Sequence, residues 1–471
     1  MTRIIAIASL QIRAAVRSKL FISLTAVLVL ILFGLPATIK GDGTLLGQMK
    51  VLLYYTLGLT TLVLGAATLW TSSGAISQEI ESRQIHLVAV KPVHPFEIWL
   101  GKWLGLLFMN ATLLCFTGLI IMGLIHRNIN GAGRSDQERR IVREELLAGR
   151  SLIRPRDTLQ QEAGNRYHTL LKKGVISADI PPEEALSEIR KQLLTENTVV
   201  PPLSSRQWVL EVPDNLNIPE EGDKTGIALK LRFSPVRAGT NSVSGRWNIG
   251  TERRSTLASM VVSNKLDGMH QMTIPITREL MKEVIAEPGR KMIVEYRNDG
   301  KERSRTLVFD RISGIELYIR ESGFESNLVR ALLVVLCRLA LLAALGLAAS
   351  TLFSSPVATF ASFSILLVSC LTHYFIILSE AGFHSCCAEH AEKASKDSVF
   401  QTANTWTIKK VETVIGPVMR IEAVGPLSDG ALVSWKDVGK AALLMAVFYP
   451  ALLGAAGVLL FRRRELALPY T

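Results

Sequence analysis

Long apolar runs alternate with charged stretches along the chain, and the runs gather near its two ends. A helix that crosses a bilayer needs about 20 mostly apolar residues, because the hydrocarbon core is about 30 Å thick. The pattern therefore predicts an α-helical integral membrane protein with six transmembrane helices. The expected spans are Leu20–Ile39, Val51–Gln78, Trp103–Ile125, Leu328–Phe353, Val357–Leu378 and Ala441–Phe461.

The first residues have a different pattern from the run that follows. Ile4, Ala8 and Ile12 fall near one face of a helix, while Arg13 and Arg17 fall on another. This pattern indicates an amphipathic helix lying at the inner membrane surface, although an early start of the first span is an alternative. A cleaved signal peptide is a further alternative, but "GLPATIKGDG" after the apolar core contains no clear small-x-small cleavage site.

Residues 126–327 form a large charged insertion between the third and fourth spans, with 32 basic and 28 acidic residues. Its first part, 126–205, is polar and helical in pattern. From Trp208 the pattern changes to short alternating runs such as "WVLEVP" and "KMIVEYR", which are typical of strands. We therefore expect an α+β insertion domain whose part 206–327 resembles a β-sandwich, and we expect residues 206–322 to fold alone.

A second segment, 379–440, separates the fifth and sixth spans and contains "HSCCAEH". His384, Cys386, Cys387 and His390 are possible metal ligands, but adjacent cysteines fit a zinc site poorly, so we assign no metal. A disulfide or free thiols are the alternatives. Cys115, Cys337 and Cys370 lie inside expected spans, where cysteine packs as a small apolar residue.

Lysine and arginine set the expected orientation, because they are enriched in cytoplasmic flanks. The composition is 48% hydrophobic with a net charge of +12, and much of this charge flanks the spans on one side. Both termini are then cytoplasmic, with 441–471 ending in a cytoplasmic tail, and 126–327 and 379–440 lie outside. The basic excess is thus an orientation signal and predicts no nucleic-acid partner.

Two ionisable residues lie well inside the expected spans, away from their first turns: Arg338 in the fourth and His373 in the fifth. Ionisable groups are costly in hydrocarbon, so they usually face a bundle interior or a water-filled path. A substrate-path role or a helix contact is possible for both, although His373 is near enough to the outer end to reach interfacial water.

The inner link between the second and third spans, residues 77–102, carries charges, two prolines and a Gly-Lys pair. Its first part can form a short helix bearing Glu79, Glu81 and Arg83, and "PFEIWLGK" restarts a helix after Lys91-Pro92. Such a rigid element is suited to docking a soluble partner, and an ordinary inner loop with orienting lysines is the alternative.

The order of residues in this link closely resembles that of the ABC type 2 transporter permeases. The shared pattern is an acid-rich segment, a Lys-Pro-Val element, a short helix and Gly-Lys; "GLAASTLFSSPVATFASF" at 346–363 and the last span add to it. The likeness covers the six spans and their inner links, roughly half the chain, and not the insertion. The residues that carry it in the link are Glu79, Glu81, Arg83, Lys91, Pro92, Val93, Glu97, Gly101 and Lys102.

The resemblance implies a permease subunit of an ABC exporter in a bacterial-type inner membrane. It implies an ATPase partner subunit that contacts the link, a second permease chain in a homodimer or heterodimer, and an envelope partner for the insertion. ATP and Mg would be bound by the ATPase subunit. No Gly-Lys pair here is followed by Ser or Thr after the P-loop pattern, so we expect no nucleotide hydrolysis by this chain.

A second class of function is a membrane-anchored extracytoplasmic binding or sensing module without transport. The charged link between the second and third spans argues against pure anchoring. An intramembrane enzyme is a third class, but the spans show no paired acids or metal-ligand pattern, and no catalytic set is apparent elsewhere.

Overall fold

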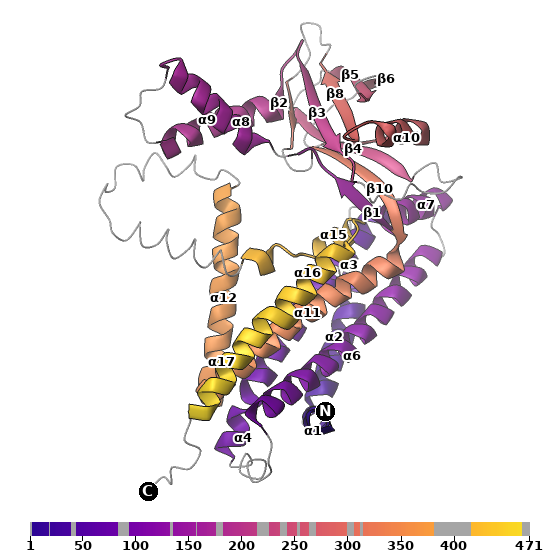
Figure 1. The fold of residues 1–471 in the computed structure, drawn as a ribbon. Coiled ribbons are helices and arrows are strands. Elements are labelled where there is room, and N and C mark those ends of the chain that lie inside the picture. Colours follow the sequence, from indigo (N-terminus) through magenta and orange to yellow (C-terminus); the bar gives the residue numbers. More distant parts are fainter. Residues whose placement is uncertain are drawn as a thin grey trace. The chain divides into compact units, whose positions relative to one another are not determined.

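The structure is a computed structural model of the chain. It describes residues 2–17, 19–38, 44–82, 94–131, 135–156, 158–175, 182–213, 226–235, 243–251, 255–262, 270–298, 306–310, 314–380 and 416–463. The chain divides into a helical unit, residues 1–147 with 323–471, and a β-rich unit, residues 148–322 (Figure 1).

The helical unit is built mainly from long apolar helices. Its first half contains α1 (Thr2–Arg17), α2 (Leu20–Thr38), α3 (Leu45–Gly74), α4 (Ser77–Glu81), α6 (Pro95–Asn130) and α7 (Asp136–Glu145). Its second half contains α11 (Phe324–Leu352), α12 (Ser355–Glu380), α15 (Val424–Ser428), α16 (Trp435–Ala441), a π-helix (Ala442–Phe448) and α17 (Tyr449–Arg463).

Within the described residues, four helices are long and apolar enough to cross a membrane: Leu45–Glu81, Pro95–Asn130, Phe324–Leu352 and Trp435–Leu460. The pair α1 and α2, bent by 65°, gives a fifth if it is counted as one span. The apolar part of α12 covers Ser355–Leu371, which is shorter than these candidate spans. The third and sixth predicted spans begin earlier than expected, because the helices start at Pro95 and Trp435.

α11 lies at the centre of the helical unit and packs against α3, α6 and α17. Small residues on α11 let these neighbours approach closely, as is common between membrane helices. A Cβ on Gly346 would overlap Ser72 Oγ in α3. Polar pairs fix the same packing: Asn110 Nδ2 donates to Thr68 Oγ1 at 2.9 Å between α6 and α3. A buried pair of this kind satisfies groups that hydrocarbon could not.

The last helix contains a π-helical stretch directly before Pro450. In a regular α-helix the ring of Pro450 would clash with the carbonyl one turn earlier. The preceding residues widen the turn instead, and the Tyr449 N–H bonds to the Leu444 carbonyl five residues back. Such turns are often found where a helix must bend or adjust.

The helical unit closes on itself where the β-rich unit is inserted. The Phe324 N–H, at the start of α11, donates to the Leu147 carbonyl, just after α7, at 3.2 Å. The chain therefore leaves the helical unit and returns to it at adjacent points.

The β-rich unit consists of two sheets that enclose one apolar core. The first sheet has the strand order β1 (Ala148–Ile153), β10 (Ile315–Gly323), β4 (Ile227–Pro235), β9 (Leu307–Phe309), β2 (Val199–Val200), with β7 (His270–Pro275) also paired to β4. The second has the order β3 (Ser205–Glu211), β8 (Lys291–Arg297), β5 (Val243–Gly250), β6 (Ser255–Val262).

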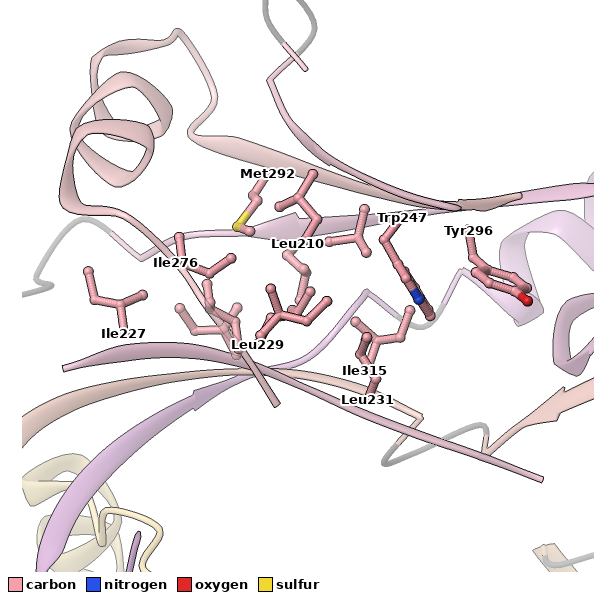
Figure 2. Packing of buried hydrophobic residues seen from close by; sticks show 14 of the residues in the cluster. Leu210, Ile227, Leu229, Leu231, Trp247, Ile276, Met292, Tyr296 and Ile315 are labelled. Carbon is pink, nitrogen blue, oxygen red and sulfur yellow. The ribbon is translucent and has the colours of Figure 1, made fainter. Parts of the chain in front are cut away.

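Alternation along the strands explains this core, since successive side chains point to opposite faces. Leu229 and Leu231 of β4 meet Leu210 and Met292 of the facing sheet (Figure 2). Helix α10 (Arg278–Ala286) adds Met281 to the same core. The β-sandwich expected from the short alternating runs is thus present as two facing sheets.

The β-rich unit begins earlier than the sequence pattern indicated. Residues 126–205 were expected to be helical, and 206 was the expected start of the β-rich part. Strands β1 and β2 precede residue 206, and Ile153 and Val200 lie in the common core. The Arg154 guanidinium on the chain after β1 donates to the buried Glu316 carboxylate of β10 at 2.9 Å. The compact unit is therefore 148–322.

Two helices form a hairpin within this unit: α8 (Leu159–Lys172) and α9 (Pro182–Thr198). They pack through a small core that includes Leu159 and Ile189. The Arg166 guanidinium donates to Glu196 at 2.7 Å and holds the pKa of that carboxyl below its usual value. A depressed carboxyl pKa contributes stability above the unfolded value, and this is lost as the pH falls through the folded pKa.

We predict that a segment of residues 148–322 unfolds in one cooperative transition, whereas 206–322 is less stable by at least about 3 kcal/mol. The shorter segment lacks two strands, buried Ile153, and the cationic partner of buried Glu316. Urea unfolding followed by circular dichroism measures the difference. Equal unfolding free energies would show that the first two strands are dispensable.

Candidate functional site

The candidate site is the corner formed by the end of α3, the short helix α4 and the first turns of α6 (Figure 1). The helix is irregular at Ala75 and Ile76, where the Ala75 N–H bonds to the Ser72 carbonyl at 3.2 Å. Both residues keep right-handed helical dihedral angles, and the Ser77 hydroxyl donates to the Ser73 carbonyl at 3.0 Å, so α4 continues α3 after this short irregular turn.

A buried ammonium group ties this turn to α6. Lys102 Nζ lies 2.6 Å from Glu79 Oε1 and donates to the Ala75 carbonyl at 2.6 Å. The Lys102 side chain is only 4% exposed, and that of Glu79 is 35% exposed. An ammonium ion removed from water needs such partners, because leaving it unpaired costs several kcal/mol. Lys102 is thus an internal link, and its charge is not displayed at the surface.

The second acid of α4 joins the corner to another helix. Glu81 Oε1 accepts a hydrogen bond from the Ser355 N–H at 3.1 Å, at the first residue of α12. A carboxylate at a helix N-terminus satisfies a free N–H group and interacts favourably with the helix dipole. The two acids of α4 therefore contact two different helices, α6 and α12.

α6 begins with a capping box formed by His94 and Glu97. Pro95 occupies the first turn, and the His94 N–H bonds to Glu97 Oε2 at 3.1 Å while His94 Nδ1 accepts from the Phe96 N–H at 3.4 Å. These contacts start the helix at Pro95. The short helix and the third span predicted separately are one continuous helix of 36 residues.

Gly101 and Gly105 let α1 lie close against α6. A Cβ on Gly101 would be 2.8 Å from Ile7 Cβ and 3.1 Å from the Ile4 carbonyl, and a Cβ on Gly105 would be 2.9 Å from Gln11 Cβ. Glycines four residues apart share one helix face, so α1 runs along that face. The Gly-Lys pair thus has two internal contacts: Gly101 faces α1, and Lys102 faces the α3–α4 turn.

Two tryptophans complete the corner. The rings of Trp99 and Trp103 stack at 6.3 Å, and Trp103 Nε1 donates to the Ala340 carbonyl of α11 at 2.9 Å. Gly454 of α17 faces the Trp99 ring, where a Cβ would approach within 2.9 Å. The first turns of α6 consequently contact α1, α11 and α17. No role was predicted for these tryptophans, although their spacing of four residues in "WLGKWLG" places them on one face of a helix.

Arg338 lies near the middle of α11 and contacts the segment before α15. Its guanidinium donates to the Ile421 carbonyl at 2.8 Å. Eleven residues earlier on α11, the Asn327 side chain donates to the Ala431 carbonyl and accepts from the Val433 N–H, both at 2.8 Å. Asn327 was not among the predicted positions, although a polar amide directly before the expected fourth span was an available signal. Arg338 and Asn327 together anchor the segment 416–434 to α11.

Several predicted positions lie outside the residues or side chains that the structure describes. They are Arg83, Lys91, Pro92 and Val93 of the link, the His373 side chain, and His384, Cys386, Cys387 and His390. Over the described part of the chain, no group of three or more His, Cys, Asp or Glu residues could hold a metal ion.

Comparisons of the chain with models of protein families, with curated proteins and with solved structures found no match.

We predict that Gly101→Ala destabilises the helical unit by about 1–3 kcal/mol, because the added methyl group overlaps Ile7 and the α1 backbone. Trypsin cleavage after Arg13 and Arg17 should become faster as α1 loosens. Gly123→Ala is the matched control in the same helix, since nothing lies within 4 Å of its Cβ position. Equal behaviour of the two variants would contradict the tight contact.

We predict that Glu79 and Lys102 are energetically coupled by about 1–3 kcal/mol. Glu79→Gln leaves a buried ammonium without its anion, so it should cost more alone than in a Lys102→Met background. Thermal unfolding of the single and double variants in detergent measures this cycle. The exposed pair Glu188 and Lys191, 3.9 Å apart, is the control and should couple by less than about 0.5 kcal/mol. Additive effects of the Glu79 and Lys102 substitutions would show that the two side chains are not energetically coupled.

Proposed function

We propose that this chain is the permease subunit of an ATP-binding cassette exporter, driven by a separate ATPase subunit. The observation that carries the proposal is the corner at α4. One short helix bears two acids, and each acid bonds to a different long helix. A partner that displaces α4 would therefore displace α6 and α12 with it.

The sequence resemblance suggests that the partner of this corner is the ATPase subunit. The segment that resembles the ATPase-contacting region of ABC type 2 permeases, 77–102, coincides with the corner. Its charged residues then have divided roles. Glu79, Glu81 and Lys102 hold the corner together, and Arg83, Lys91 and Pro92 remain candidates for contact with the ATPase subunit.

The proposal includes six spans, with both termini in the cytoplasm and residues 126–327 outside. The Lys/Arg asymmetry supports this topology, and so does the common position of α1, α4 and the end of α17 at one end of the helical unit (Figure 1). A second permease chain completes the transporter, in a bacterial-type inner membrane. The β-rich unit would receive or release substrate, or dock an envelope partner. ATP and Mg would bind only the ATPase subunit.

The proposal is tested by purifying the tagged full chain from its native membrane and identifying the proteins that accompany it. We expect an ATPase subunit, and we expect ATP turnover by the complex but not by the isolated chain. A chain that purifies alone, or that turns over ATP alone, would favour the membrane-anchored binding module or another class of protein.

The same complex tests the role of the corner. A fluorophore at the exposed position Phe360 of α12 should report an ATP-dependent change. Glu81→Ala should reduce that change while the ATPase subunit still co-purifies, because the bond to Ser355 is lost. Glu325→Ala, which removes an acid from the first turn of α11, is the control. An unaltered signal in Glu81→Ala would remove the coupling role from α4.

A further inference from the structure

α1 presents three distinct stripes along its length. The stripe that includes Ile4, Ile7 and Gln11 faces α6, where Gly101 and Gly105 leave room for it. Residues three, four, seven or eleven positions apart share a helix face at 3.6 residues per turn. The remaining two stripes are therefore turned away from α6.

One of these outward stripes is apolar. Ile5 and Val16 are eleven residues apart, which is about three turns, and they are 67% and 49% exposed. These side chains face away from α6, and acyl chains would cover them if α1 lies at a membrane surface.

The other outward stripe is basic. Arg13 and Arg17 are four residues apart and exposed, and Arg3 falls close to Arg17 around the helix. Leu10, 62% exposed, lies among them. Thr2–Arg17 contains no acidic residue, so Arg13 and Arg17 have no acidic neighbour on α1.

The turn that follows sets α1 at an angle to the next helix. Lys19 has a φ of 57°, in the left-handed region that rarely suits a residue with a side chain. α1 and α2 are bent by 65° relative to each other. α1 is therefore not a straight continuation of α2, and a bend of this kind is what an interfacial helix before a membrane-crossing helix requires.

We infer that Arg13 and Arg17 on the basic stripe of α1 bind the headgroups of anionic phospholipids. The adjoining stripe of Ile5 and Val16 inserts among the acyl chains. Lipid is favoured over an acidic protein because an apolar stripe beside a basic one matches the boundary between acyl chains and phosphates. The inference rests on the membrane insertion in the proposed function, and it does not require the ATPase subunit.

The position of the stripe gives the lipid a means to affect the corner. α1 packs on Gly101, and the next residue, Lys102, holds the α3–α4 turn. Lipid that orders α1 therefore supports the first turns of α6, on which the corner is built.

The test uses the full chain purified in mild detergent. It is titrated with dioleoyl phosphatidylglycerol or dioleoyl phosphatidylcholine, and bound lipid is counted by native mass spectrometry. We expect phosphatidylglycerol to be retained preferentially, and Arg13→Gln with Arg17→Gln to lower that preference by roughly tenfold or more. Arg13→Lys with Arg17→Lys should retain most of it, and added salt should weaken it in the unaltered chain.

Arg140→Gln with Arg143→Gln is the matched control, since both arginines are exposed on α7. Equal retention of the two lipids by the unaltered chain would overturn the inference and leave the stripe to an acidic protein partner. An unchanged preference in the α1 Gln variant, or an equal loss in the α7 control, would also overturn it. If the Gln variant does not fold, a preference that is insensitive to salt in the unaltered chain would be decisive against it.

Discussion

The helical unit depends on one ammonium group that has almost no access to water. The Lys102 ammonium is buried among helices, and Glu79 Oε1 and the Ala75 carbonyl oxygen each lie 2.6 Å from its Nζ. Moving either partner away would leave a buried cation, so the turn after α3 and the start of α6 must move together or not at all. The neighbouring contacts share this geometry, since Gly101 positions α1 and Trp103 positions α11 on the same turns of α6.

This constraint changes the meaning of charge in the segment 77–102. Charged side chains near the end of a helical bundle invite interpretation as a docking surface. Here Glu79, Glu81 and Lys102 all have partners in the same chain, and the contacts join α4 to α6 and α12. A displacement of α4 would reach α6 and α12 through these internal contacts, so its transmission depends more on their stiffness than on the strength of any surface ion pair.

The sequence pattern predicted the helices and strands better than it predicted the contacts between them. Run lengths located the apolar helices, and alternation located β4, β8 and β10, because burial on one face or on all faces leaves a periodic trace. Strand β1, whose six residues include an arginine, a glycine and a serine, leaves little such trace. The roles of Lys102, Asn327 and Arg338 could not be predicted, since each partner is distant in sequence: periodicity indicates which face is buried, and not what lies against it.

The bond between the Phe324 N–H and the Leu147 carbonyl has an evolutionary consequence. Where a chain leaves and re-enters a scaffold at neighbouring points, a whole domain can be gained, exchanged or lost without altering the scaffold's connectivity. The helical unit and the β-rich unit can therefore diverge at different rates, one constrained by its interlocked helices and the other free to follow whatever it binds. Relatives that lack residues 148–322 should need only a short loop to close the gap.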